Sequence, residues 1–241
     1  MRLFDYDSGL MQALNKMANL VILNLLALVC CIPIITIGAS ITAVHYSVLK
    51  MKRGTDDYPV RNFFKSFKEN FKQSTILFLI EMFFIVLSVL ALFIMSGAKG
   101  TFNSIVSGVI LADCLIIVFT TLWLYPLQAR FVNKITATIR NAFMFSLRYI
   151  HRTLFMLIAQ LLPIALMVIS FRFFPVVLLF GISVPAFLNV YGYDKIFVQL
   201  EERIMEEQSD GQEKKELGPW EAAEKRAEEE RERERREKER V

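Results

Sequence analysis

The chain has 241 residues, of which 54% are hydrophobic, and 21 of them are phenylalanine. This apolar content exceeds that of ordinary soluble domains, so the composition argues against a soluble globular protein and indicates an integral membrane protein. The three cysteines lie inside apolar runs without metal-ligand spacing, which argues against both a disulfide framework and a zinc site.

The first apolar stretch carries no formal charge between Lys16 and Lys50, which is a length of about 50 Å as one helix. A bilayer core is about 30 Å thick, so the stretch is too long for one crossing and too short for two. Pro33 and Gly38 mark the expected break, because proline removes a backbone donor and glycine accepts unusual dihedral angles. We predict a first span over about residues 17–36.

Residues 37–52 are predicted to follow this span along the cytoplasmic interface. Apolar residues recur at helical spacing from Ile41 to Met51, whereas His45 falls on another side. A path that re-enters the membrane stays open as the alternative. We interpret His45 as a polar-face histidine rather than as part of a proton relay.

Two basic amphipathic helices are predicted, over residues 60–74 and 139–153. The first precedes a span over about residues 75–96, and the second precedes a span over about residues 153–171. In each helix the cations recur every three or four residues on one side, and apolar side chains occupy another. The cations expected to contact anionic lipid headgroups are Arg61, Lys65, Lys68, Lys72, Arg140, Arg148 and Arg152.

Two further apolar runs, at about residues 105–127 and 173–191, bring the number of predicted spans to about five. The cation-rich segments 50–72 and 130–152 are cytoplasmic by the positive-inside rule. An odd number of spans then places the N-terminus outside and the C-terminus in the cytoplasm. The predicted fold class is an all-α, polytopic helical membrane protein with interfacial helices and a charged tail.

The tail over residues 201–241 holds 16 acidic and 11 basic residues and follows a predicted membrane domain over residues 1–200. Breaks are expected from about Gln199, at "DGQ" and "LGP". Beyond them, glutamates pair favourably with cations four residues later, but no apolar stripe accompanies these pairs. We predict a solvated cytoplasmic tail, partly helical or disordered, with a docking handle for a partner as the alternative.

Two carboxyl groups lie inside the predicted spans, Asp113 near the midplane and Glu81 nearer the inner end. Ionisable groups are costly in a bilayer core, so each either takes part in a proton or substrate relay or fixes helix packing through hydrogen bonds. Both interpretations stay open for Asp113, and packing is favoured for Glu81. Residues considered as hydrogen-bond partners are Thr120, Thr121, Asn24 and Gln160.

Signatures of soluble enzymes are absent from the sequence, which has no P-loop, HExxH, CxxC or GxSxG pattern and only two histidines. We therefore expect no enzymatic activity. No catalytic, cofactor-binding or metal-binding residue is predicted, and no nucleic-acid partner is expected.

Several of these segments together resemble the YesL-like family of bacterial membrane proteins, a domain of unknown function, over roughly residues 1–200. The most specific piece is "IPIITIGASITA", which is similar to the family pattern Leu-Pro-x-x-Thr-x-Gly-Ala-x-x-x-Ala, with Ile32 at the leucine position. The resemblance implies a part in carbohydrate uptake, because members occur beside sugar importers, but it implies no reaction and no catalytic residue. The long charged tail departs from the family's usual short end.

The favoured hypothesis is a non-enzymatic accessory or scaffold protein associated with carbohydrate uptake in the bacterial cell membrane, with an importer's subunits as possible partners. The alternative is a small secondary carrier or channel that uses Asp113. Transporters often contain broken helices around a midplane site, and Pro33, Pro163 and Gly181 are candidate breaks.

Overall fold

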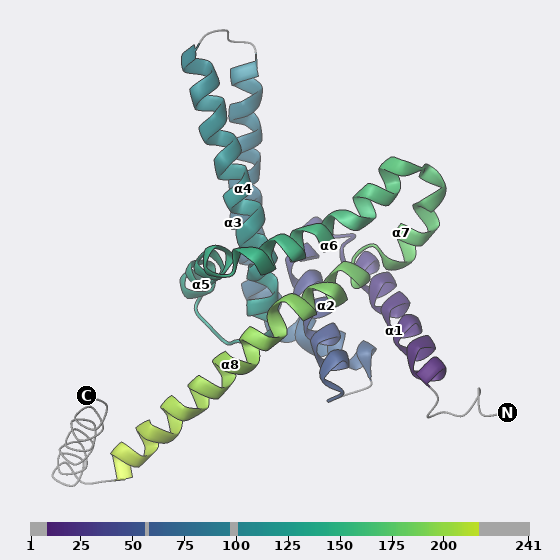
Figure 1. Ribbon diagram of the computed structural model, residues 1–241, viewed down its shortest axis with the longest axis vertical. Helices are drawn as coiled ribbons and strands as arrows, with labels where there is room; N and C mark the ends of the chain where they lie inside the picture. The colour runs from purple at the N-terminus through teal and green to yellow at the C-terminus, as the bar shows by residue number, and fades with distance from the viewer. Residues whose placement is uncertain (1–8, 56–57, 97–100, 217–241) are drawn as a thin grey trace, which may run out of the picture. The chain divides into compact units, whose positions relative to one another are not determined.

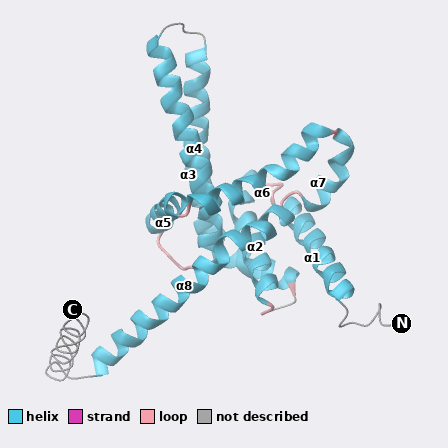
Figure 2. Cartoon of the chain, in the orientation of Figure 1, coloured by secondary structure: helices cyan, strands magenta, loops and turns pink. Residues whose placement is uncertain are grey.

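The computed structural model describes residues 9–55, 58–96 and 101–216. Figure 2 shows helices and loops throughout this part of the chain, with no strand in it. The α-helices are α1 (Gly9–Cys30), α2 (Ile37–Arg53), α3 (Pro59–Ser96), α4 (Thr101–Arg130), α5 (Ile135–Arg148), α6 (Ile150–Ile169), α7 (Phe174–Phe180) and α8 (Ser183–Glu216), with 3-10 turns η1 (Ile34–Thr36) and η2 (Phe171–Phe173).

Five of the described helical segments are long and apolar enough to cross a membrane, and a bent pair adds a further candidate. This confirms a polytopic helical membrane protein. The five segments are Leu10–Cys30, Ile34–Arg53, Pro59–Met95, Ser104–Arg130 and Ile150–Ile169.

The chain divides into two compact units, Met1–Tyr193 and Asp194–Val241. In the second unit the described residues belong to α8, which continues without interruption to Glu216. The break predicted at "DGQ" is therefore wrong, since those residues are helical. "LGP" and the rest of the tail lie outside the described residues.

The sequence predicts that the first span ends at about residue 36, but α1 ends at Cys30. The reason is that the chain turns at Pro33 before α2 begins. The hydroxyl of Thr36 donates to the carbonyl oxygen of Pro33 at 2.6 Å and is also within hydrogen-bonding distance of the Cys30 carbonyl. The contact with Cys30 serves a carbonyl that the end of α1 leaves unpaired.

α2 is enclosed by its neighbours, which corrects the expectation that residues 37–52 lie along the membrane surface. Eleven of its 17 residues are buried, and His45 is only 7% exposed. A Cβ atom on Gly38 would lie 2.4 Å from the carbonyl oxygen of Ser74, so the backbones of α2 and α3 approach closely there. The hydroxyls of Thr42 and Ser74 are 3.0 Å apart. α2 thus packs along the basic half of α3.

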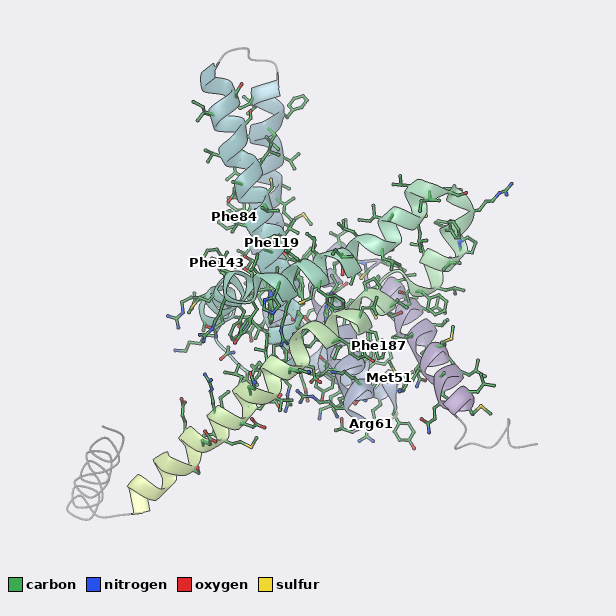
Figure 3. The ribbon with its side chains drawn as sticks, viewed as in Figure 1. Met51, Arg61, Phe84, Phe119, Phe143 and Phe187 are labelled. Atoms are coloured by element: carbon green, nitrogen blue, oxygen red, sulfur yellow. The ribbon has the colours of Figure 1, made fainter. Side chains whose placement is uncertain are left out.

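α3 is one helix of 38 residues, about 57 Å long. The sequence predicts a separate interfacial helix over residues 60–74, which the structure corrects, because no break separates that segment from the apolar segment after it. Figure 1 shows α3 and α4 side by side. In Figure 3, Arg61 lies near Met51, at the end of α3 that meets the C-terminal end of α2.

The second predicted amphipathic helix divides at Tyr149, where α5 ends and α6 begins, so residues 139–153 do not form one helix. The predicted span over residues 173–191 is broken as well. Its two parts meet at 61° near Gly181 and Ile182, between α7 and α8. Gly181 is thus the position of a real break, as the sequence indicates.

The middle of α1 lies beside α7 and the second half of α6, next to the break between α7 and α8. Met17 and Leu20 line an apolar cavity of about 260 Å³ together with Leu166 of α6 and Val176 of α7. Further along α1, Ala27 accepts a hydrogen bond from the Ser40 hydroxyl of α2. α1 therefore contacts α7 through its middle and α2 through its C-terminal part.

Candidate functional site

Glu81 of α3 is held by two hydroxyl groups of α4. Its Oε1 accepts from Thr121 and its Oε2 accepts from Tyr125, both at 2.6 Å. Thr121 and Tyr125 are four residues apart, so they lie one above the other on one face of α4. Thr121 is a partner that the sequence proposes. Tyr125 was not among the partners proposed from the sequence.

A cavity of about 330 Å³ lies beside this carboxyl group, among α2, α3, α4, α6 and the first part of α8. Most of its wall is aliphatic, from residues such as Ile85, Ile117 and Leu157. The polar and titratable residues that line it are His45, Glu81, Cys114, Thr121, Tyr125, Gln160 and Asn189. A mostly apolar pocket with a few convergent polar groups is typical of small-molecule sites.

Asn189 is the unexplained member of this group. It is 1% exposed, and its Oδ1 atom is buried without a hydrogen-bond partner among the described residues. Buried polar groups are normally paired, so an orphan acceptor on a cavity wall indicates a place for a donor. His45, also on the wall, has its Nδ1 atom 3.4 Å from the Tyr193 hydroxyl.

Asp113 is not brought to this cavity. Its side chain is exposed, and its Oδ2 accepts a hydrogen bond from the Ser88 hydroxyl of α3 at 2.9 Å. The residues around it on α4 are apolar and exposed, including Leu111, Leu115 and Ile116. Asp113 and Glu81 therefore lie in different surroundings, and Glu81 is the carboxyl group of the cavity.

Glu81 and Thr121 also line a second, more apolar cavity of about 270 Å³, on the side of α5. Its wall includes Phe84 and Phe143, which Figure 3 labels near each other where α3, α4 and α5 meet. The hydrogen-bonded pair of Glu81 and Thr121 thus borders two cavities in the unit Met1–Tyr193.

Most of the predicted headgroup cations lie on the surface. The four in the basic half of α3 and two in or at the end of α5 are exposed: Arg61, Lys65, Lys68, Lys72, Arg140 and Arg148. Arg152 is half-buried, and its Nη1 donates to the backbone carbonyl of Gly192 at 2.9 Å. Arg152 therefore joins α6 to the first part of α8 instead of being a free surface cation.

A buried polar stripe on α3 was missed from the sequence. Asn62, Ser66 and Ser74 are at most 2% exposed, and Asn70 between them accepts from the Gln128 amide of α4 at 3.0 Å. These four residues recur every four positions, on the face next to α2 and α4. The four-residue spacing of these polar side chains was the sequence pattern that could have indicated the stripe. The cations and phenylalanines of the same helix obscured this pattern.

Among the described residues, no group of three or more His, Cys, Asp or Glu side chains is arranged to hold a metal ion. The three cysteines are free thiols.

Residues 20–92 match the family model described as "Protein of unknown function, DUF624". No curated protein and no solved structure matches the chain. The matched segment holds the second half of α1, all of α2 and most of α3. It therefore includes "IPIITIGASITA", Gly38 and the polar stripe, which are the features that bring these three helices together.

Proposed function

We propose that this chain is a non-enzymatic accessory or scaffold component of a carbohydrate-uptake system in the bacterial cell membrane. The carbohydrate part rests on the resemblance of "IPIITIGASITA" and the basic segments to YesL-like proteins. The match to a family of unknown function over residues 20–92 is compatible with this proposal but names no substrate.

The observation that carries the scaffold role is the exposure of Asp113. An aspartate at the centre of a membrane helix costs about 3 kcal/mol when it faces lipid. The Ser88 hydroxyl donates to one oxygen of the Asp113 carboxyl group, but the Asp113 side chain stays exposed among apolar neighbours. A hydrogen-bond donor on the transmembrane helix of another protein would remove this cost, since polar side chains in membranes join helices.

The outer halves of α3 and α4 provide the rest of such a contact surface. Figure 1 shows them extending together away from the other helices of the membrane unit. Large side chains on them are strongly exposed, among them Phe83 at 64%, Phe93 at 76% and Val109 at 65%. We define this hairpin face around Asp113 as the α3–α4 face and propose it as the site for a partner's transmembrane helix.

We further propose that the cation-rich ends of the helices and the charged tail are cytoplasmic and that the N-terminus is outside. The exposed cations of α3 and α5 favour an anionic inner leaflet. α6 starts beside these cations, so the α6–α7 connection lies on the outer side. With the charged tail in the cytoplasm, the odd number of spans predicted from the sequence then puts the N-terminus outside.

The test is capture from native membranes with a photo-crosslinking amino acid at Leu111 or Leu115, which flank Asp113 on the α3–α4 face. We expect crosslinks to transmembrane subunits of a solute importer, and we expect Asp113→Leu to reduce them strongly. The matched control places the crosslinker at Leu161 of α6, which is exposed but distant in sequence from the α3–α4 face. Equal crosslinking at all three positions, or none at Leu111 and Leu115, contradicts the proposal.

The alternative, a small carrier, draws support from the broken α7–α8 pair and from the cavity beside Glu81. Asp113 does not line that cavity, so a carrier that moves its solute through the cavity would depend on Glu81, and a carrier that uses Asp113 would need another path. Purified protein reconstituted alone in liposomes should then show saturable solute uptake, whereas a scaffold should show none.

A further inference from the structure

The cavity beside Glu81 has the chemistry of a ligand site. Its volume of about 330 Å³ accommodates a small molecule, and its wall comes from five helices. We propose that it binds a small organic cation, a protonated amine with an apolar body. This site is independent of the partner surface around Asp113.

The negative group of the site is the Glu81 carboxylate. A carboxylate has about four acceptor positions, and the hydroxyls of Thr121 and Tyr125 occupy one on each oxygen. Among the described residues that line the cavity there is no lysine or arginine, so none of them supplies a counter-charge there. An ammonium group would fill the remaining acceptor positions and supply that charge.

The second acceptor is independent of Glu81. The Oδ1 atom of Asn189 comes from α8, is buried, and has no partner in the described part of the chain. An ammonium group has three donors, so one ligand could donate to a carboxylate and to an amide oxygen in the same cavity. The orphan acceptor and the uncompensated carboxylate thus favour the same class of ligand.

The rest of the wall selects the body of the ligand. Aliphatic side chains of Ile41, Ile85, Val89, Ile117 and Leu157 cover most of it, and Tyr125 adds a phenol ring. A free sugar would leave many hydroxyl groups without partners on such a wall, which is costly. An alkyl or aryl group is buried there favourably.

The primary test measures binding of phenethylammonium to the full-length protein in nanodiscs of zwitterionic phosphatidylcholine, by equilibrium dialysis against empty nanodiscs. The neutral isostere 2-phenylethanol is the matched ligand control. We expect the ammonium to bind at least ten-fold more tightly than the alcohol. Glu81→Gln keeps the size of the side chain but removes the charge, so it should abolish this preference, and Asn189→Leu should weaken ammonium binding several-fold.

Glu69→Gln is the matched protein control, because Glu69 is an exposed glutamate on the same helix. It should bind both compounds as the native protein does. Equal binding of the ammonium and the alcohol to native protein overturns the proposal. The same loss in Glu69→Gln as in Glu81→Gln also overturns it, because the effect would then be one of general charge.

A second measurement keeps the native Glu81 and so does not depend on the folding of that variant. Cys114 is a free, half-buried thiol on the cavity wall. In a Cys30→Ser, Cys31→Ser background, saturating phenethylammonium should slow alkylation of Cys114 by N-ethylmaleimide at least five-fold, and 2-phenylethanol at the same concentration should not. Unchanged alkylation with the ammonium places the ligand elsewhere and rejects this site.

Discussion

Asn24 of α1 caps the start of α8, because its side-chain oxygen accepts a hydrogen bond from the backbone N–H of Ser183 at 3.0 Å. The same oxygen accepts from the N–H of Ile182 at 2.7 Å, and the side-chain nitrogen donates to the carbonyl of Leu178 at 2.8 Å. Broken membrane helices need such partners for their freed backbone groups. One buried amide thus stabilises the bend between α7 and α8.

Replacing Asn24 by leucine should therefore destabilise the protein. Leucine fills a similar volume but leaves three backbone groups, one buried and two part-buried, without this partner, at a total cost of about 3 kcal/mol. Thermal unfolding in detergent should show a lower midpoint, by roughly 5–10 °C. Asn15→Leu is the control, since Asn15 is exposed on the same helix, and an equal midpoint for the two variants would refute the capping role.

Gly38 sets the distance between α2 and α3. Alanine there would place its Cβ atom 2.4 Å from the carbonyl oxygen of Ser74 and 2.7 Å from Cβ of Phe78, so the helices must separate. We expect Gly38→Ala to cost about 2 kcal/mol of stability, as overpacking does in close-packed interiors.

Gly108 of α4 offers the matched control, because a Cβ atom there would meet nothing within 4 Å. Gly108→Ala should be neutral or stabilise the helix by up to about 1 kcal/mol. The measurement is the unfolding midpoint of both variants in the same detergent. A Gly38→Ala midpoint as high as that of Gly108→Ala would show that α2 and α3 are not closely packed.

Long apolar segments were the most predictable part of this fold. The 3.6-residue period and bilayer-length runs indicate α3, α4 and α6 directly, because each helix satisfies its own backbone groups. The enclosure of α2 was not predictable in this way. Its side chains, among them Ser40, Thr42 and Ser47, are small and polar, and they resemble an interfacial face until the structure shows what covers them.

The candidate site was predictable only in part. Glu81 and Thr121 follow from the cost of a carboxyl group in a membrane, which requires a nearby donor. Asn189 and His45 come from helices far apart in the sequence, so only the tertiary structure places them on one cavity wall. Asp113 could not be assigned to an exposed position from sequence, because nothing local determines which face of α4 is covered.

The proposed topology predicts which positions react with a membrane-impermeant thiol reagent in intact cells. In a version without native cysteines, Gln12→Cys on α1 should be labelled from outside, and Lys65→Cys on α3 should be labelled only after permeabilisation. Both native side chains are exposed, whereas Ser66 and Ser146 are buried and would resist the reagent on either side. Labelling of Lys65→Cys in intact cells would reverse the orientation.

The exposed cations of α3 predict a dependence on anionic lipid. Replacing Lys65, Lys68 and Lys72 by glutamine removes charges that each contribute about 1 kcal/mol of attraction near an anionic surface. Adding phosphatidylglycerol to phosphatidylcholine nanodiscs should raise the unfolding midpoint of native protein more than that of the triple variant. High salt should reduce the difference. An equal response of both proteins would rule out this electrostatic contact.

Asp113 separates a scaffold from a carrier through two substitutions with opposite consequences. Asp113→Asn keeps the size and an acceptor for the Ser88 hydroxyl, so a partner's donor can still bind, and association should be nearly unchanged if Asp113 only joins helices. Asp113→Leu removes the acceptor and should release the partner, while the isolated protein becomes equally or more stable in lipid because an exposed carboxyl group is gone. Quantitative co-purification and unfolding midpoints measure the two effects.

A carrier that uses the titration of Asp113 gives the reverse pattern, since Asp113→Asn would abolish solute uptake by the reconstituted protein. We expect no uptake from the native protein alone, and saturable uptake abolished by Asp113→Asn would establish the carrier instead.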